Sequence, residues 1–497
     1  MFKLSSYTKY RLLEIFPGFL VWLTFIMAII LSFWKPIIAI YLIIIFDLYW
    51  LLKVFYLTIH LFFSWRRFKK EQKINWWEKV KKIPEKNWRD YYHLIFFPTY
   101  KEPYEVIKRA FDHLIKSNYQ TKQFIVILGG EERDQKNFLK IAEKIKNEFA
   151  HHFFQLLITV HPQGVPGELP GKGSNMNYMG RQAQALVDQL GFDYSKLIVS
   201  AFDIDTCVQP QYFANLTYQY LNHPKPTQAS YQPLTIYHNN IWESDPVTRV
   251  VAVSTTFWLL TELARSERLF TFSSHSMSFQ ALTDVGFWQN DIVTEDSRIF
   301  LQCLIYYDGD YEVVPLFVPV SMNTVAIDNF WRSLVNQYKQ MRRWGWGCEH
   351  FPYLAWNFWK NKKIPLAKKI RYLWNQTEGM YSWATAPLLI LILGRLPLWV
   401  LDLHAHQSVI TLNAPIILQW LMTGAMIGLL VIAIFSVLML PPKPSQLKKW
   451  HYLIMFLQWL LFPVTTIIFG SIPAIDAQTR LMLGGKFRLG FWVTEKK

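Results

Sequence analysis

The chain has 497 residues, of which 52% are hydrophobic and 17% aromatic, and its formal net charge is +16. It is longer than one typical domain and more apolar than an ordinary soluble enzyme, so we expect part of it to lie in lipid. Its basic residues gather beside apolar segments, and this argues against a nucleic acid partner. The three cysteines show no CxxC spacing, so we expect no structural zinc.

Two apolar runs near the N-terminus predict a membrane hairpin. Residues 16–34 and 37–63 are each long enough to cross about 30 Å of hydrocarbon. The turn between them holds one basic residue, Lys35, whereas ten Lys and Arg residues lie between Arg66 and Arg89. Because basic loops favour the cytoplasm, we expect both ends of the hairpin, and the domain that follows it, to lie inside.

Short apolar segments alternate with amphipathic stretches from about residue 91 to residue 319. Three of these segments, 92–97, 123–128 and 196–202, end at polar clusters. Apolar strands followed by polar turns and helices predict a mostly parallel α/β sheet. Ligands of such sheets bind at the carboxyl ends of the strands, which is where these polar clusters fall.

The last part of the chain predicts further membrane contact. Residues 329–359 are rich in Trp, Tyr, Phe and Arg without a long apolar run, as in segments that lie on a membrane surface. Apolar runs at 382–401, 416–440 and 452–469 predict three more spans.

Five spans would put the C-terminus outside, although the tail is basic. Three explanations stay open: a re-entrant last segment, a hidden span near Arg395, or a tail that tolerates the outside. The expected domains are a transmembrane hairpin (1–63), a basic linker (64–90), a catalytic domain (91–328), interfacial helices (329–380), transmembrane helices (381–470) and a basic tail (471–497).

Asp203-Ile204-Asp205 directly follows an apolar strand. Alternate residues of an extended segment point the same way, so both carboxylates can reach one place. A divalent ion such as Mg²⁺ or Mn²⁺ held there would grip a diphosphate. The pattern therefore predicts a metal-assisted nucleotide-sugar site.

Thr294-Glu295-Asp296 lies between an apolar segment and a predicted helix. A carboxylate at this place could take a proton from an acceptor hydroxyl. The alternative is that Thr294 and Glu295 only cap the helix.

Gln340, Arg343 and Trp344 are spaced three and four residues apart, so one helical face presents all three. Arginine forms a two-pronged clamp for pyrophosphate, and tryptophan offers an apolar face for a sugar ring. The alternative is an ordinary Arg-Trp anchor at the membrane interface.

The order of these motifs resembles that of the membrane-integrated family-2 glycosyltransferases, the group that contains cellulose, chitin and hyaluronan synthases. The resemblance covers roughly residues 92–350 and the flanking membrane segments. It rests on Pro98-Thr99-Tyr100-Lys101-Glu102-Pro103, Lys172-Gly173-Ser174-Asn175-Met176-Asn177, the DxD of 203–205, the TED of 294–296 and the Gln-x-x-Arg-Trp of 340–344.

The resemblance implies a GT-A-like nucleotide-sugar-binding domain inserted between transmembrane helices, and it implies a role for each motif. Asp296 would be the general base, with Glu295 beside it, and Asp205 would be the metal ligand. The residues implied to bind the donor are Thr99, Tyr100, Glu102, Lys172, Asn177, Asp203, Asp205 and Arg343, and Trp344 and Gln340 would border the acceptor.

The chain departs from the family pattern at two places. Glu131 stands where relatives commonly have an aspartate that contacts the base, and the longer side chain leaves the nucleotide open. The stretch 272–279 lies where relatives have acceptor-site residues before the TED, but it lacks their usual start. Its position makes Ser274 and His275 candidate acceptor contacts, with a structural histidine as an equal alternative.

These features predict an inverting glycosyltransferase of the plasma (inner) membrane with a cytoplasmic catalytic domain. Its donor would be a nucleotide sugar, with a UDP-sugar favoured, and its acceptor a growing polysaccharide whose synthesis is coupled to export. The alternatives are transfer of one sugar to a lipid or polyprenyl phosphate, and a transporter or scaffold with an inactive transferase domain. The expected partners are the donor, a glycan or lipid acceptor and the lipid bilayer.

Overall fold

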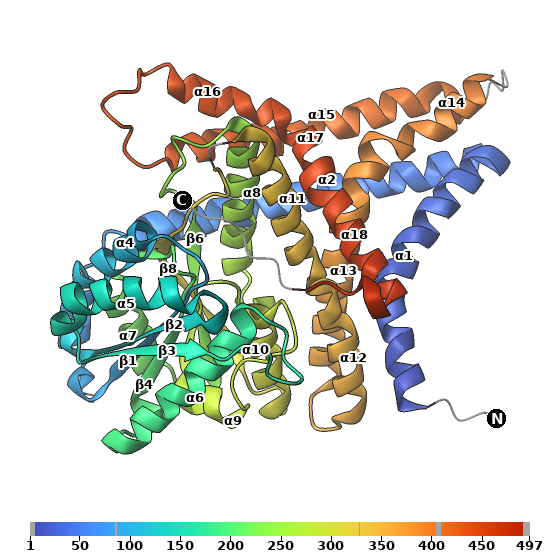
Figure 1. Ribbon diagram of the computed structural model, residues 1–497. Helices are drawn as coiled ribbons and strands as arrows, with labels where there is room; N and C mark the ends of the chain where they lie inside the picture. The colour runs from blue at the N-terminus through green and yellow to red at the C-terminus, as the bar shows by residue number, and fades with distance from the viewer. Residues whose placement is uncertain (1–4, 85–86, 328, 404–408, 491–497) are drawn as a thin grey trace.

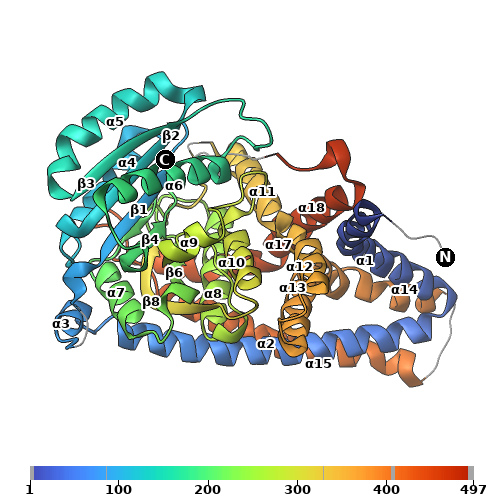
Figure 2. The ribbon, with the colours of Figure 1, turned by 90° about the horizontal axis from the view of Figure 1, so that it is seen from below.

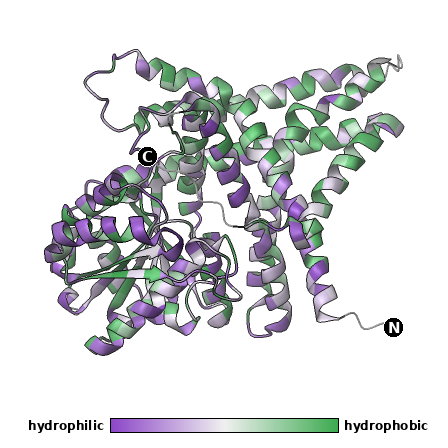
Figure 3. Cartoon of the chain, in the orientation of Figure 1, coloured by the Kyte–Doolittle hydropathy of each residue, from purple (hydrophilic) through white to green (hydrophobic). Residues whose placement is uncertain are grey.

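Long apolar helices from both ends of the chain pack beside a sheet-containing domain (Figure 1). The computed structural model describes residues 5–84, 87–327, 329–403 and 409–490. The last residues of the predicted tail, 491–497, lie outside the described residues. Figure 3 shows the division by polarity, with hydrophobic residues prevailing on the long helices and hydrophilic ones over the outside of the sheet domain.

The N-terminal hairpin consists of α1 (Ser6–Trp34) and α2 (Pro36–Glu71), followed by α3 (Trp76–Lys81). Ser5 caps α1, because its side chain accepts a hydrogen bond from the backbone N–H of Thr8 at 3.1 Å. Pro36 occupies the first turn of α2, where its missing N–H costs nothing. The turn of the hairpin thus lies at residues 35 and 36, as expected from the sequence.

Within the described residues the sheet has eight strands in the order β3-β2-β1-β4-β7-β6-β8-β5. The pairs β1–β2, β1–β4, β2–β3 and β6–β8 are parallel, and β4–β7, β6–β7 and β5–β8 are antiparallel. The α/β prediction is confirmed, although the sheet is mixed. The strands are β1 (Tyr92–Pro98), β2 (Phe124–Glu131), β3 (Gln155–His161), β4 (Leu197–Ala201), β5 (Cys207–Val208), β6 (Ala229–Ile236), β7 (Ser276–Ser278) and β8 (Glu312–Ser321).

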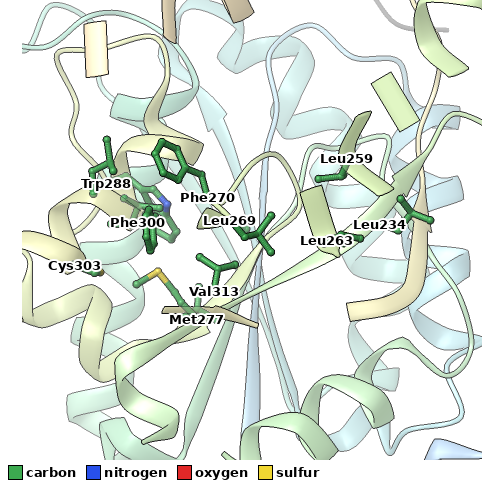
Figure 4. Close-up of a cluster of buried hydrophobic side chains, with 14 of the residues drawn as sticks. Leu234, Leu259, Leu263, Leu269, Phe270, Met277, Trp288, Phe300, Cys303 and Val313 are labelled. Carbon is green, nitrogen blue, oxygen red and sulfur yellow. The ribbon is translucent and has the colours of Figure 1, made fainter. Parts of the chain in front are cut away.

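Helices cover both faces of this sheet. Successive residues of β1 alternate between two cores: Leu94 and Phe96 face one, and Ile95 and Phe97 face the other. The first core extends to side chains from α8, α10 and β8 (Figure 4). The helices of this domain are α4 (Tyr104–Ile115), α5 (Gln135–Phe149), α6 (Lys172–Leu190), α7 (Tyr212–Asn222), α8 (Pro246–Leu263), α9 (Phe279–Asp284) and α10 (Glu295–Tyr306).

The short strand β7 brings a loop to the carboxyl end of β4. β7 runs antiparallel to β4, and Ser200 near the end of β4 pairs with Ser276 at the start of β7. The residues that precede β7 therefore lie at the carboxyl end of β4, beside the DxD.

The remaining helices return the chain to the apolar part. The sequence of elements is α11 (Phe330–Gly345), the 3-10 turn η8 (Trp346–Glu349), α12 (His350–Lys360), α13 (Leu366–Leu391), η9 (Leu393–Arg395), α14 (Leu396–Leu403), α15 (Val409–Leu438), α16 (His451–Leu457), α17 (Phe462–Thr466), the π-helical turn η11 (Ile467–Ser471) and α18 (Ile472–Leu483).

Among the described residues, four helical stretches are long and apolar enough to cross a membrane: Ser6–Trp34, Pro36–Glu71, Leu412–Leu438 and His451–Leu483. A fifth would be the pair Leu366–Leu391 and Leu393–Leu401, which is bent by 45° at a short break. These stretches coincide with the five apolar runs of the sequence.

The two ends of the last apolar stretch contact the start of α1 and the sheet domain, which the sequence analysis expects to lie on the same side. At its end, Arg11 of α1 donates to the carbonyl of Leu481 at 2.8 Å, and Arg488 pairs with Glu14. At its beginning, the ring of Tyr452 lies 5.8 Å from that of Trp242 in the sheet domain. Of the three explanations for the basic tail, these contacts favour a re-entrant last segment.

Candidate active site

Lys172, the first residue of α6, brings the DxD and the TED together. Its ammonium lies 2.7 Å from Asp203 Oδ1, 2.7 Å from Asp296 Oδ2 and 3.6 Å from Glu295 Oε1. Gly171 before it adopts φ 153°, a conformation that favours glycine and turns the chain into α6. The DxD at 203–205 and the TED at 294–296, two acidic motifs far apart in the sequence, thus share one cation.

The charges of this cluster depend on one another. Burial lowers the pKa of Lys172, but Asp203, Asp296 and Glu295 outweigh burial and raise it, so the ammonium stays charged. Burial raises the pKa of Glu295 to about 7, with Asp296 adding to the effect and Lys172 and Arg343 opposing it. Burial thus brings the pKa of Glu295 close to neutral pH.

Both DxD carboxylates are held in place by other strand ends. Ser273, in the loop before β7, donates to Asp203 Oδ2 at 2.8 Å. The backbone N–H of Asn323 after β8 donates to Asp205 Oδ2 at 3.0 Å, and Asn239 after β6 donates to the carbonyl of Asp205 at 2.9 Å. The sequence analysis missed these three residues, although each follows a strand or precedes β7 at the same edge of the sheet.

The predicted base-binding residues gather at the ends of β1 and β2. The backbone N–H of Thr99 donates to the carbonyl of Gly129 at 2.7 Å, and that of Tyr100 donates to the carboxylate of Glu102.

Glu131 is buried at the end of β2 and accepts from Nε of Arg133 at 2.9 Å. The guanidinium carbon of Arg133 lies 4.4 Å from the centre of the Tyr100 ring. Arg133, which the sequence analysis did not single out, therefore joins the end of β2 to the residues after β1. Arg133 and Glu131 together are a candidate surface for a nucleobase.

Asn177 ties α6 to the segment before the TED. Its side chain donates to the carbonyl of Trp288 at 2.7 Å and accepts from Nε of Arg181 at 2.9 Å. Its contact with the donor stays a prediction.

Ser274 and His275 are both fully buried. The hydroxyl of Ser274 lies 2.9 Å from that of Thr206. Nδ1 of His275 lies 3.0 Å from the carbonyl of Phe272, and because a carbonyl only accepts, that nitrogen carries the proton. Burial lowers the pKa of His275, so the ring is neutral. These surroundings favour the structural alternative, and an acceptor contact of either residue stays a prediction.

The helix expected for the Gln-x-x-Arg-Trp element is α11. Arg343 lies close enough to Glu295 and Tyr237 for its charge to act on both: burial raises the pKa of each group, and Arg343 opposes the rise. The guanidinium of Arg343 thus belongs to the same electrostatic cluster as the TED.

Trp344 and Gln340 contact residues outside the TED. Gln340 accepts from Nε2 of Gln337 at 3.3 Å, one turn earlier in α11. Trp344 is half-buried against an apolar cluster that contains Val251, Met341 and Phe469.

The family model described as "Glycosyl transferase family group 2" matches residues 198–475, which is more than half of the chain. The chain belongs to this family. The match includes the DxD, the TED, the Gln-x-x-Arg-Trp helix and most of the C-terminal apolar helices. The protein is therefore a family-2 glycosyltransferase.

Two solved structures are among those that match this chain at low identity. The mannosyltransferase PcManGT from Pyrobaculum calidifontis, in complex with GDP-Man and Mn²⁺, has 13% identity and a TM-score of 0.42, over 82% of this chain and 99% of that one. S. aureus TarS 1–349, in complex with UDP-GlcNAc, has 11% identity and a TM-score of 0.38, over 69% of this chain and 90% of that one. A comparison with curated protein sequences found no significant match.

Residues beyond the expected motifs support the TED of this glycosyltransferase. The hydroxyl of Thr294 donates to the carboxylate of Glu349 in η8, which also accepts from Nε1 of Trp346 at 2.9 Å. In the described structure the side chain of Thr294 makes no capping bond with α10. The capping alternative is therefore wrong for Thr294, whose hydroxyl serves the contact with η8.

His350 extends this support. Its Nε2 lies 2.7 Å from the hydroxyl of Ser297, and its Nδ1 accepts from Nε of Arg298 at 3.2 Å. Burial, together with the charge of Arg298, lowers the pKa of His350 well below its ordinary value, so the ring is neutral. Because α12 begins at His350, the segment after the Gln-x-x-Arg-Trp element holds the helix that carries the TED.

The glycosyltransferase's carboxylates fit a hard divalent ion, because Mg²⁺ and Mn²⁺ prefer oxygen ligands and Asp203 and Asp205 supply them from one turn, closed by a hydrogen bond from the N–H of Thr206 to the carbonyl of Asp203. Across the residues that the structure describes, no three His, Cys, Asp or Glu side chains gather as a complete ligand set. An ion at the DxD would therefore take further oxygens from the donor's diphosphate or from water.

Proposed function

We propose that the protein is an inverting glycosyltransferase that moves a sugar from a nucleoside-diphosphate donor to a growing polysaccharide at the cytoplasmic face of a membrane. The observation that carries this proposal is the ammonium of Lys172, which lies 2.7 Å from a carboxylate of the DxD and 2.7 Å from one of the TED. The residues expected to bind the diphosphate and to take the proton are thereby neighbours.

In the proposed reaction, Asp296 takes a proton from the acceptor hydroxyl, whose oxygen attacks the anomeric carbon opposite the diphosphate. The bond between the anomeric carbon and the diphosphate oxygen breaks, and the configuration at the anomeric carbon is inverted. Lys172 and Arg343 stabilise the negative charge that develops on the leaving group. Asp205, with Asp203 beside it, would hold Mg²⁺ or Mn²⁺, which when bound supplies further neutralisation of the diphosphate.

The donor would lie along the carboxyl edge of the sheet. Its base would meet Tyr100, Glu102 and the Glu131–Arg133 pair, and its diphosphate would reach Lys172 and the DxD. Trp344, with Gln340 on the same helix, would border the acceptor on the side of the apolar helices. In this proposal a growing product would leave the site past those helices, so that synthesis is coupled to export.

The base assignment is tested by Asp296→Asn. We expect turnover to fall by about 10² or more, because the amide cannot accept the proton, while donor binding stays near that of the wild type. Release of nucleoside diphosphate measures turnover, and calorimetric titration measures donor binding. Asp291→Asn is the matched control, because Asp291 is an exposed carboxylate of the same segment. Near-normal turnover of Asp296→Asn would remove this residue from the base role.

The donor and the metal are tested together. The purified protein is offered UDP-, GDP- and dTDP-sugars with and without Mg²⁺ or Mn²⁺, alongside Asp205→Ala. We expect ion-dependent turnover of one donor that the variant loses. Equal turnover by the variant would contradict the role of Asp205.

The acceptor is tested by the products of the donor that passes. A ladder of increasing length supports polysaccharide synthesis. A single labelled product that partitions into organic solvent supports instead the transfer of one sugar to a lipid or polyprenyl phosphate.

A further inference from the structure

Asp476, on the last helix α18, grips the helix that carries the Gln-x-x-Arg-Trp element. Its Oδ2 accepts from Nη1 of Arg342 at 2.9 Å and from the hydroxyl of Tyr338 at 3.1 Å. Its Oδ1 accepts from Nε of Arg480, one turn further along α18, at 2.6 Å. One carboxylate therefore binds two side chains of α11, which lies far from it in the sequence, and one of its own helix.

The two gripped residues belong to the face of α11 that crosses α18 most closely. Tyr338, Arg342 and Gly345 follow one another at four and three residues, so they lie on one side of the helix. A Cβ on Gly345 would lie 3.2 Å from Cα of Ala474 and 3.4 Å from Cβ of Ala477. The helices thus meet where only a glycine fits without displacement, and the ion pair lies one turn from that point.

α18 is itself wedged in place, as Figures 1 and 2 show by its position between α1 and α11. A Cβ on Gly18 of α1 would lie 2.7 Å from the carbonyl oxygen of Gln478. The side chain of Gln478 donates to the carbonyl of Met380 in α13 at 2.9 Å. Helices on other sides therefore fix the position from which Asp476 reaches α11.

Arg342 and Arg343 are neighbours, so their side chains leave α11 about 100° apart. Arg342 points to Asp476, whereas Arg343 acts on Glu295 and Tyr237 in the site. A rotation of α11 that released Arg342 would also move Arg343 away from the site.

We propose that Asp476 is a positioning residue: by holding Arg342 and Tyr338 it sets the rotation of α11 and so places the guanidinium of Arg343 against the donor's diphosphate. The inference rests on the role of Arg343 in the proposed function. Asp476 lies one residue beyond the family match, which ends at residue 475.

The test compares the affinity for a nucleoside diphosphate with that for the corresponding monophosphate, which keeps the base and ribose but lacks the outer phosphate. Calorimetric titration in Mg²⁺ uses the UDP/UMP or GDP/GMP pair that the wild type binds. Arg343→Gln calibrates the clamp, and we expect it to weaken diphosphate binding by about tenfold or more. For Asp476→Asn we expect roughly three- to tenfold weaker diphosphate binding and unchanged monophosphate binding.

Two further variants complete the design. Arg480→Gln removes a guanidinium from the same carboxylate without touching α11, so we expect it to bind both nucleotides as the wild type does. Tyr338→Phe removes only one hydrogen bond across the helices, and we expect a smaller loss of the same kind. It keeps the test decisive if Asp476→Asn does not fold.

The outcomes separate the inference from the proposed function. If Arg343→Gln loses diphosphate affinity while Asp476→Asn and Tyr338→Phe bind both nucleotides normally, Asp476 does not position the clamp, although the clamp stands. If Asp476→Asn weakens mono- and diphosphate alike, its role is general stability and the inference is overturned. If Arg343→Gln keeps full diphosphate affinity, the clamp of the proposed function fails and the inference falls with it.

Discussion

Glu295 and Asp296 are adjacent in the sequence but meet different surroundings. The side chain of Glu295 is 2% exposed and that of Asp296 is 20% exposed, although both lie within reach of Lys172. The side chain of Asp296 is therefore more accessible to an acceptor hydroxyl than that of Glu295. This difference supports Asp296 as the base and leaves Glu295 as a buried acid that titrates near pH 7.

The raised pKa of Glu295 predicts a pH-dependent stability. The folded state holds this proton more tightly than the unfolded chain, whose glutamate titrates near 4.5. The contribution is thus complete below pH 4.5 and is lost as the pH rises through about 7. Glu295→Gln stays neutral, so we expect its melting temperature to exceed that of the wild type by a margin that grows over this window.

Thermal melts of the detergent-purified protein at a series of pH values measure this margin. Glu105→Gln, which removes an exposed carboxylate of α4, is the control and should follow the wild type. A constant margin for Glu295→Gln would show that Glu295 does not titrate differently in the folded state.

Local patterns could predict the acidic motifs but not the residues that hold them. Asp203 and Asp205 follow a buried strand. Ligands of α/β sheets bind at the carboxyl ends of strands, and the end of this strand is visible in the sequence. Asn239 and Asn323 reach Asp205 only because β6 and β8 end at the same edge, which is a property of strand order. Glu349 likewise gave no signal, since its partner Thr294 lies in another element.

At the scale of elements, glycines decide how closely the helices of the apolar part approach. In α1, a Cβ on Gly18 would lie 2.7 Å from the carbonyl oxygen of Gln478 and 2.7 Å from Cβ of Met482. In α13, a Cβ on Gly379 would meet no atom of the described structure within 4 Å. The two glycines therefore differ in the effect of one added methyl group.

We expect Gly18→Ala to destabilise the protein by about 1–3 kcal/mol, because α1 must move away from α18. Gly379→Ala should leave stability unchanged or raise it by up to about 1 kcal/mol, because alanine favours the helix. Melting temperatures of the two variants in the same detergent give the comparison. Equal effects of both substitutions would contradict a close crossing at Gly18.

The helices were predictable where apolar runs are continuous, and less so where packing breaks them. Long apolar runs mark α1, α2 and α15 in the sequence because each span must be apolar over its length. The break between α13 and α14 and the π-helical turn before α18 fall within apolar runs, so hydropathy alone does not show them.

At the scale of the whole molecule, the contacts divide the ends of the apolar helices into two sets. The first turns of α2 lie near the end of α14 and the first turns of α15, as the cluster of Ile40, Leu401 and Ala414 shows. The start of α1 contacts the end of α18 and, through the rings of Tyr10 and Trp356, also contacts α12. A re-entrant α16–α18 segment accounts for this division.

Cysteine labelling tests the topology. Cys207, Cys303 and Cys348 are buried, so a membrane-impermeant maleimide should react little with the unmodified protein. We expect Lys35→Cys to react from one face of sealed vesicles and Lys486→Cys from the other. Both lysines are exposed, but Lys35 follows the last residue of α1, whereas Lys486 follows α18, whose end contacts the start of α1. Labelling of both from the same face would contradict the re-entrant segment.

The place of α18 also bears on the order in which a newly made chain becomes competent. A ribosome completes Lys172, the DxD, the TED and α11 before it reaches α18, and α12 to α17 are made in between. Until α18 is inserted, Gly345 and Arg342 face no partner helix. A nascent chain that already holds every acidic motif would thus lack the contact proposed to place Arg343 until its last helix has been made, so that full affinity for the donor comes only after the surrounding helices are in place.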